Sequence, residues 1–314
     1  MQTGVIMGYY GHIWQKKALF DYASFCKNIG IGHFIYAPKQ DDYLRAIWQQ
    51  NWPREWFHDL QEIRALYKQY GIKFGVALRP VNLSKFNADT KKLTLQRLAQ
   101  INDQELDSLT ISFDDIDINE TGVVDKKLAV EQINFTLEAI NHSNSKDFYF
   151  TPSYYSYSGI LLSLLGNSIK ERNEYLEQIS SLPAKINILW AGDDIINKGI
   201  PKTTIEKINH ILKRKICLWD NYPVNDPGWM RQNMANCYPL TGRTHKLSTV
   251  VKEHFANPML QPYISQLALA SLPAIYQQAN EYSAEEEFIK NLKIYAPELK
   301  DFMQEEIKTL DEIS

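Results

Sequence analysis

The segment SLTISFDDID, residues 108–117, joins an apolar run to three carboxylates within four residues. Residues 108–113 have the length and composition of a buried strand, and Asp114, Asp115 and Asp117 follow directly. Like charges repel at short range, and burial adds to the cost of each charge. The segment therefore predicts a strand whose carboxyl end carries a chemical site.

Similar short runs recur along the chain and alternate with amphipathic stretches. The other predicted strands are residues 4–9, 33–37, 73–78, 148–151, 186–190 and 215–219, with a weaker eighth near 234–238. The predicted helices are residues 18–29, 55–70, 91–100, 126–140, 169–179, 204–212 and 259–278. Parallel strands need crossover connections, so this alternation predicts a parallel α/β sheet. Such units fit a (β/α)8 TIM barrel, with a doubly wound open sheet as the alternative.

The predicted barrel domain covers residues 1–282, and residues 283–314 are predicted to form a short C-terminal helical appendage. The formal net charge of −3, without any block of Lys and Arg, argues against nucleic-acid and membrane partners. Cys26 shares a predicted helical face with Leu19 and is expected to pack in the core. We see no signal peptide in this sequence and expect a cytoplasmic protein, unless an export signal lies outside it.

Polar residues gather at the ends of the predicted strands. They are Lys39 after the second strand, Asp114 and Asp115 after the fourth, Tyr154 and Tyr155 after the fifth, and Asp220, Asn221 and Asp226 after the seventh. The carboxyl ends of barrel strands face one pole, where active sites lie. These side chains are therefore expected to converge.

Three interpretations of the carboxylates are open from the residues alone. They could bind a hard divalent cation, although no His-rich or EF-hand pattern accompanies them. They could cap helices or form salt bridges outside the barrel. They could also perform acid and base chemistry on a glycosidic bond, since neighbouring carboxylates push their pKa values apart. Trp219 and Tyr155 would suit a sugar ring in that third case.

Six ordered motifs favour the third interpretation. They are GYYGHIW at residues 8–14, YAPKQDDY at 36–43, SFDDID at 112–117, TPSYY at 151–155, WDNYPVND at 219–226 and ANPM at 256–259. Together they resemble the catalytic domain of glycoside hydrolase family 84, which contains protein O-GlcNAcases and bacterial β-N-acetylglucosaminidases. The resemblance runs through residues 3–280, nearly the whole predicted barrel.

This resemblance implies a retaining β-N-acetylglucosaminidase in which the 2-acetamido oxygen of the substrate attacks the anomeric carbon. The product of that step is an oxazoline, and no enzyme nucleophile takes part. Carried over to this sequence, Asp114 orients and polarises the acetamido N–H. Asp115 acts first as the general acid and then as the general base.

The resemblance also assigns the substrate contacts. Tyr155 would hydrogen-bond the acetamido oxygen, and Trp219 would form the wall of the pocket for its methyl group. The groups expected to hold the sugar hydroxyls are Lys39, Asn221, Asp226 and Asn257, with the Gly8 carbonyl nearby. Asp117 and Asp220 are interpreted as structural, and His12 as a surface or rim residue.

Three positions depart from the family pattern. Met7 and Tyr154 stand where relatives often carry an acidic residue, and the loop after the third strand reads LRPVNL. These departures are expected to reshape the rim of the site. The expected substrate is a GlcNAc-containing glycoside or glycoprotein, with no cofactor and no metal. The alternative function is a non-catalytic GlcNAc-binding protein on the same barrel.

Overall fold

The computed structural model describes residues 1–166, 168–226 and 236–297 of the chain. Eight parallel strands close into a barrel in chain order, because β1 pairs with both β2 and β8. They are β1 (Gln2–Met7), β2 (His33–Tyr36), β3 (Lys73–Leu78), β4 (Ser108–Ser112), β5 (Asp147–Thr151), β6 (Ile186–Trp190), β7 (Cys217–Asp220) and β8 (Glu253–Ala256). The predicted (β/α)8 TIM barrel is confirmed, and the open sheet is excluded.

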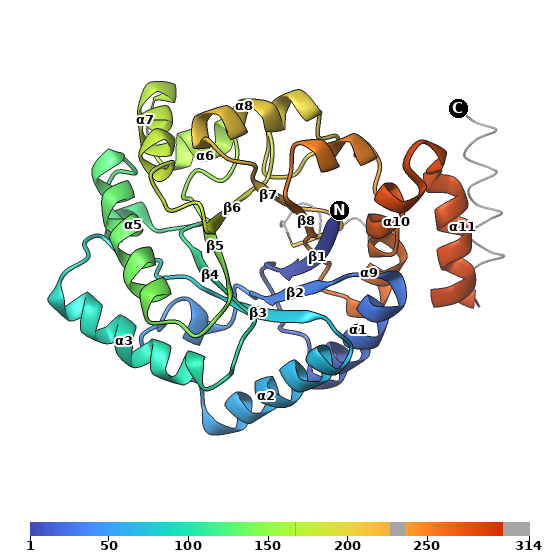
Figure 1. Ribbon diagram of the computed structural model, residues 1–314, viewed down its shortest axis with the longest axis horizontal. Helices are drawn as coiled ribbons and strands as arrows, with labels where there is room; N and C mark the ends of the chain where they lie inside the picture. Colours follow the sequence, from blue (N-terminus) through green and yellow to red (C-terminus); the bar gives the residue numbers. More distant parts are fainter. Residues whose placement is uncertain (167, 227–235, 298–314) are drawn as a thin grey trace.

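Helices surround the strands on the outside of the barrel (Figure 1). Those that follow β1 to β4 are α1 (Lys16–Ile29), α2 (Arg54–Gln69), α3 (Ala88–Asn102), α4 (Ile118–Thr121) and α5 (Lys126–Asn141). Those that follow β5 to β8 are α6 (Gly159–Leu164), α7 (Ile169–Ile179), α8 (Lys202–Leu212), α9 (Pro262–Leu269), α10 (Ser271–Gln278) and α11 (Ala284–Tyr295).

The strand sequences alternate between the two faces of the barrel wall, which produces two apolar layers. Val5 and Met7 belong to the large core between strands and helices, whereas Ile6 belongs to a smaller cluster that includes Ile35 and Phe255. The large core also contains Cys26, as predicted. Both layers are buried and exclude water.

The predicted eighth strand is wrong. Residues 236–238 form no strand, and residues 234 and 235 lie outside the described part of the chain. The Asn236 side chain instead donates hydrogen bonds to the carbonyls of Pro223 and Val224, which ties this segment to the loop after β7. The true eighth strand, Glu253–Ala256, has only four residues, and two of them are ionisable.

The predicted long helix over residues 259–278 is two helices, α9 and α10, which are separated at Ala270. Pro273 lies in the first turn of α10, where its missing N–H costs nothing because that position has no helical acceptor. Helix α11 packs on α9 through Leu267, Phe288 and Leu292. The division of the chain at residue 282 stays a prediction, and residues 298–314 lie outside the described part.

Candidate active site

A cavity of about 370 Å³ opens at the carboxyl ends of the strands. We call it the mouth cavity. All nine residues predicted for the site line it, namely Gly8, Lys39, Asp114, Asp115, Tyr155, Trp219, Asn221, Asp226 and Asn257. They come from the loops after β1, β2, β4, β5 and β8, and from β7 and the loop after it. The closure of the barrel therefore brings together segments that are far apart in the sequence.

The two aspartates reach this cavity through an unusual backbone turn. Phe113 still pairs with β5, through its N–H and the Thr151 carbonyl, at 2.9 Å. In a continued strand, Asp114 and Asp115 would point to opposite faces. Asp115 instead has a φ of 53°, in the left-handed region that aspartate tolerates better than most residues. This turn lets both carboxylates contact the same cation.

That cation is Lys39, a buried residue in the lining of the mouth cavity. Its ammonium donates to Asp114 Oδ2 and, at 2.7 Å, to Asp115 Oδ2. Its backbone N–H is fixed by the Tyr9 carbonyl at 3.0 Å. The buried Arg79 adds a second positive charge, with Nε 3.4 Å from Asp114 Oδ1. Two neighbouring carboxylates are therefore balanced by two buried cations, which explains how the pair is tolerated.

Asp115 has further partners that act on its charge. Tyr10 donates its hydroxyl to Asp115 Oδ2 at 2.9 Å, and Tyr155 donates to Oδ1 at 3.2 Å. Burial raises the pKa of the Asp115 carboxyl, but Lys39 and the two tyrosines outweigh it, so its pKa lies below the ordinary value. Asp115 is therefore a carboxylate at neutral pH in this arrangement. Burial also raises the pKa of both tyrosines, which stay hydrogen-bond donors.

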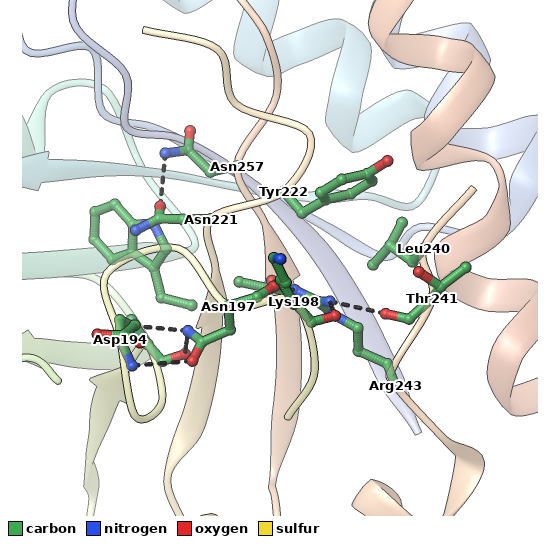
Figure 2. Close-up of polar contacts among 12 residues, drawn as sticks. Asp194, Asn197, Lys198, Asn221, Tyr222, Leu240, Thr241, Arg243 and Asn257 are labelled. Atoms are coloured by element: carbon green, nitrogen blue, oxygen red, sulfur yellow. Dashed lines mark hydrogen bonds and ion pairs between the residues drawn. The ribbon is translucent and has the colours of Figure 1, made fainter. Parts of the chain in front are cut away.

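The opposite wall of the mouth cavity is a chain of hydrogen bonds from β1 through β8 to β7. The Gly8 N–H donates to Asn257 Oδ1 at 3.0 Å, and Asn257 Nδ2 donates to Asn221 Oδ1 at 3.0 Å. Trp219 Nε1 donates to the same oxygen at 2.9 Å. Figure 2 shows the Asn257–Asn221 contact. A Cβ atom on Gly8 would lie 2.3 Å from the Trp219 ring, so only glycine allows this close approach.

A buried ionic cluster supports this wall from outside the cavity. Arg243 forms a two-pronged contact with Asp220 at 2.8 and 2.6 Å, and His254 Nε2 lies 3.1 Å from the same carboxylate. Arg243 also donates to the carbonyls of Asn197 and Lys198, in the loop after β6 (Figure 2). The cluster fixes that loop beside the end of β7. Asp220 is thus structural, as predicted.

The structure also agrees with the interpretation of Asp117 as a structural residue and of His12 as a surface or rim residue. Asp117 caps α4, where its side chain accepts from the Asn119 N–H at 2.8 Å. His12 is exposed. Asp226 accepts from the Tyr10 N–H at 2.7 Å and thereby joins the loop after β7 to the loop after β1.

Sequence reasoning missed several residues of the site. Tyr10 lies within the GYYG motif but had no assigned role, and Arg79 was seen only as part of an unusual loop. The missed residues that line the cavity are Tyr10, Thr151, Leu189, Trp190, Ala191, Ile195, Ile196 and Val224. Six of them are apolar residues at the end of β6 or in the loops after β6 and β7, which a sequence pattern cannot separate from core residues.

Within the described ranges, no group of three or more His, Cys, Asp and Glu side chains is placed to hold a metal ion. None of the helices formed by the described residues has the length and apolar character needed to cross a bilayer.

Paired, charge-compensated carboxylates in an aromatic-walled cavity at the mouth of a (β/α)8 barrel are typical of a glycoside hydrolase. The model of the beta-N-acetylglucosaminidase family matches residues 3–310. The chain belongs to this family of glycoside hydrolases, which confirms the resemblance found in the motifs.

Two curated relatives are the protein O-GlcNAcases of Rattus norvegicus and Mus musculus. Each is 28% identical to the chain over 284 residues, which is 87% of this chain and 30% of the relative. The chain therefore spans less than a third of the length of these relatives. A solved mutant structure of an O-GlcNAc hydrolase from Thermobaculum terrenum has a TM-score of 0.83 at 24% identity, and covers 96% of this chain and 64% of that one. That likeness shows the shared fold.

Proposed function

We propose that the chain is a retaining, exo-acting β-N-acetylglucosaminidase that hydrolyses terminal β-linked GlcNAc through an oxazoline intermediate. The observation that carries the proposal is the shared Lys39 contact of Asp114 and Asp115. Two carboxylates on one ammonium lie on the same side of the cavity. A retaining enzyme with its own nucleophile instead needs two carboxyl groups that flank the sugar.

Asp114 is proposed to act on the attacking group. Its Oδ2 is bound to Lys39, whereas its Oδ1 has no hydrogen-bond partner among the described residues. Asp114 lines the mouth cavity, so a substrate acetamido N–H can donate to its carboxylate. That contact would draw electron density from nitrogen to the amide oxygen and direct that oxygen at the anomeric carbon.

Asp115 is proposed to transfer the proton, and sugar binding is proposed to prepare it. General acid catalysis needs a proton on this carboxyl, yet its present contacts favour the charged form. If Tyr155 turns its hydroxyl from Asp115 to the acetamido oxygen, the carboxylate loses one donor. Displacement of water by the sugar then adds to the desolvation, and both changes raise the pKa of Asp115.

The remaining groups are proposed to select the sugar. Trp219 offers an apolar wall for the acetamido methyl group, and its ring is held by Asn221. Asn257, Asp226 and the Gly8 carbonyl would bind hydroxyl groups, together with Lys39. Natural substrates are proposed to be glycosides or glycoproteins with a terminal β-GlcNAc. A cytoplasmic location stays a prediction.

The test of the proposed function is hydrolysis of matched chromogenic glycosides. The purified chain is expected to release the chromophore from the β-GlcNAc glycoside, and to leave the α-anomer and the β-glucoside intact. The first sugar product should be β-GlcNAc, as seen by NMR before mutarotation. Tight GlcNAc binding without any turnover would favour the non-catalytic alternative instead.

A further inference from the structure

Arg79 stands out among the buried charges of the molecule. It follows β3 directly and is fully buried, but it does not line the mouth cavity. Its backbone N–H donates to the Leu44 carbonyl at 2.7 Å, which fixes the loop. None of its three side-chain nitrogens has a hydrogen-bond partner among the described residues. Among the described residues, Arg79 forms one ion pair, which is with Asp114.

A buried guanidinium is costly unless its charge is compensated. Arginine does not escape that cost by losing its proton, because the guanidinium stays charged throughout the range in which proteins fold. The closest compensating charge is Asp114 Oδ1, 3.4 Å from Arg79 Nε. The contact lacks the geometry of a hydrogen bond, and it involves the Asp114 oxygen that Lys39 does not contact.

The surroundings of the two carboxylates differ in charge. Lys39 contacts both, whereas Arg79 contacts Asp114 alone. The Asp114 side chain is 5% exposed and that of Asp115 is 28% exposed. The Asp114 carboxylate thus contacts two cations and little water, and the Asp115 carboxylate contacts one cation and more water. The other groups that face the pair are the hydroxyls of Tyr10 and Tyr155, which donate to the Asp115 carboxylate, and the side chain of Arg45, which donates to the Asp115 backbone carbonyl.

We infer that Arg79 is a positioning residue, which gives the Asp114 carboxylate a second fixed cation and so directs the catalytic proton to Asp115. The inference rests on the proposed function, because it presumes that the two carboxylates have different roles. Hydroxyl donors can turn toward a sugar, and Lys39 can share its protons with sugar hydroxyls. Arg79 is outside the cavity, so its charge stays beside Asp114 throughout the reaction.

The experiment replaces Arg79 and measures the pH profile of kcat/KM with a chromogenic β-GlcNAc glycoside. Arg79→Met removes the charge and keeps most of the volume, and Arg79→Lys keeps the charge. Arg97→Met is the matched control, because Arg97 is also fully buried but stacks on Trp52, 4.0 Å from its ring centroid, outside the cavity.

In Arg79→Met the fixed charge that directs the proton to Asp115 is gone, so the acidic limb of the profile moves to higher pH and turnover falls by roughly one to two powers of ten. The basic limb moves less, since Arg79 contacts only Asp114. Arg79→Lys restores the wild-type limb. Arg97→Met lowers the melting temperature without moving either limb. If Arg79→Met does not fold, Arg79→Gln gives the same readout with a polar side chain.

An acidic limb that stays in place when the charge is removed overturns the inference, even if turnover falls, because lost packing alone lowers activity at every pH. A wild-type chain with no activity on the β-GlcNAc glycoside overturns the proposed function and this inference with it. If the wild-type chain is active but the acidic limb of the pH profile does not move in Arg79→Met and Arg79→Gln, only the role of Arg79 is overturned.

Discussion

The left-handed backbone at Asp115 is the single-residue feature on which the site depends. It places two consecutive carboxylates on one ammonium, which an extended strand cannot do. Such positions carry conformational strain and often occur at functional sites. The proposed division of roles between Asp114 and Asp115 therefore belongs at the residue scale, where it can be tested by separate replacements.

Asp115→Asn removes the proposed proton donor and should slow hydrolysis by about 10²–10⁴-fold for a glycoside with a poor leaving group. An activated aryl glycoside needs little protonation of its leaving group, so the decrease in its rate of hydrolysis should be much smaller. Asp114→Asn should slow both substrates, because Asp114 acts on the attacking amide. The measurement is kcat/KM across a series of leaving groups.

Asp117→Asn is the matched control, because Asp117 caps α4 and asparagine is an equally good cap. It should leave the whole leaving-group series unchanged. An Asp115→Asn variant that loses the same factor with every leaving group would refute the assignment of the acid.

Tyr155→Phe removes the hydroxyl that contacts Asp115 and is proposed to reach the acetamido oxygen. Turnover and the affinity for a GlcNAc-thiazoline should fall together, by about 1–3 kcal/mol for a lost buried hydrogen bond. Tyr157→Phe is the control, because the Tyr157 hydroxyl has no hydrogen-bond partner among the described residues. Loss of turnover with unchanged thiazoline affinity would contradict the proposed role of Tyr155.

At the scale of elements, the Asp220–Arg243–His254 cluster fixes the end of β7. Burial raises the pKa of Asp220, but Arg243 and His254 outweigh it and bring the pKa to about 2. The stabilisation is therefore complete above the unfolded-state pKa, near about 4, and is lost as pH falls through the folded value.

Asp220→Asn should lower the free energy of unfolding by about 3–5 kcal/mol at neutral pH, because it leaves the buried Arg243 unpaired. The difference from wild type should shrink as pH falls from about 4 toward about 2, since the wild-type carboxylate then takes up its proton. Urea unfolding at several pH values measures this difference in the free energy of unfolding. Asp21→Asn, on the surface, is the control and should change little. A difference that is constant with pH would show that the charge of Asp220 is not its cause.

The sequence predicted most elements, because long apolar runs and amphipathic periods identify them without tertiary information. β3, β6 and α7 have the predicted bounds. β8 was missed because Glu253 and His254 are buried polar residues, and their partners come from other strands. The Tyr149 hydroxyl donates to Glu253 at 2.7 Å, a contact that only the closed barrel creates.

Some residues of the site were predicted from the sequence, and others were not. Charged residues at strand ends are conspicuous in a sequence, so Lys39, Asp114 and Asp115 were identified. Arg79 escaped notice because its importance lies in a contact with Asp114 across the β3–β4 boundary. The turn at Asp115 escaped notice because aspartate gives no sequence signal for a positive φ.

At the scale of the whole molecule, the closed barrel (Figure 1) is a frame. It brings segments that are far apart in the sequence together around one cavity. Under the proposed function, the sugar would lie between the Asp114–Asp115 side and the Trp219–Asn221 side. Within this frame, the substrate's own acetamido oxygen is proposed to attack the anomeric carbon.

That claim is tested most directly by β-GlcNAc glycosides whose acetamido group carries one, two or three fluorine atoms. Fluorine withdraws electron density from the amide oxygen, so kcat should fall step by step along the series, while a β-glucoside should not react. Equal rates across the series, or a glycosyl ester trapped on Asp114, would contradict the claim, because they would show that a carboxylate of the enzyme attacks instead.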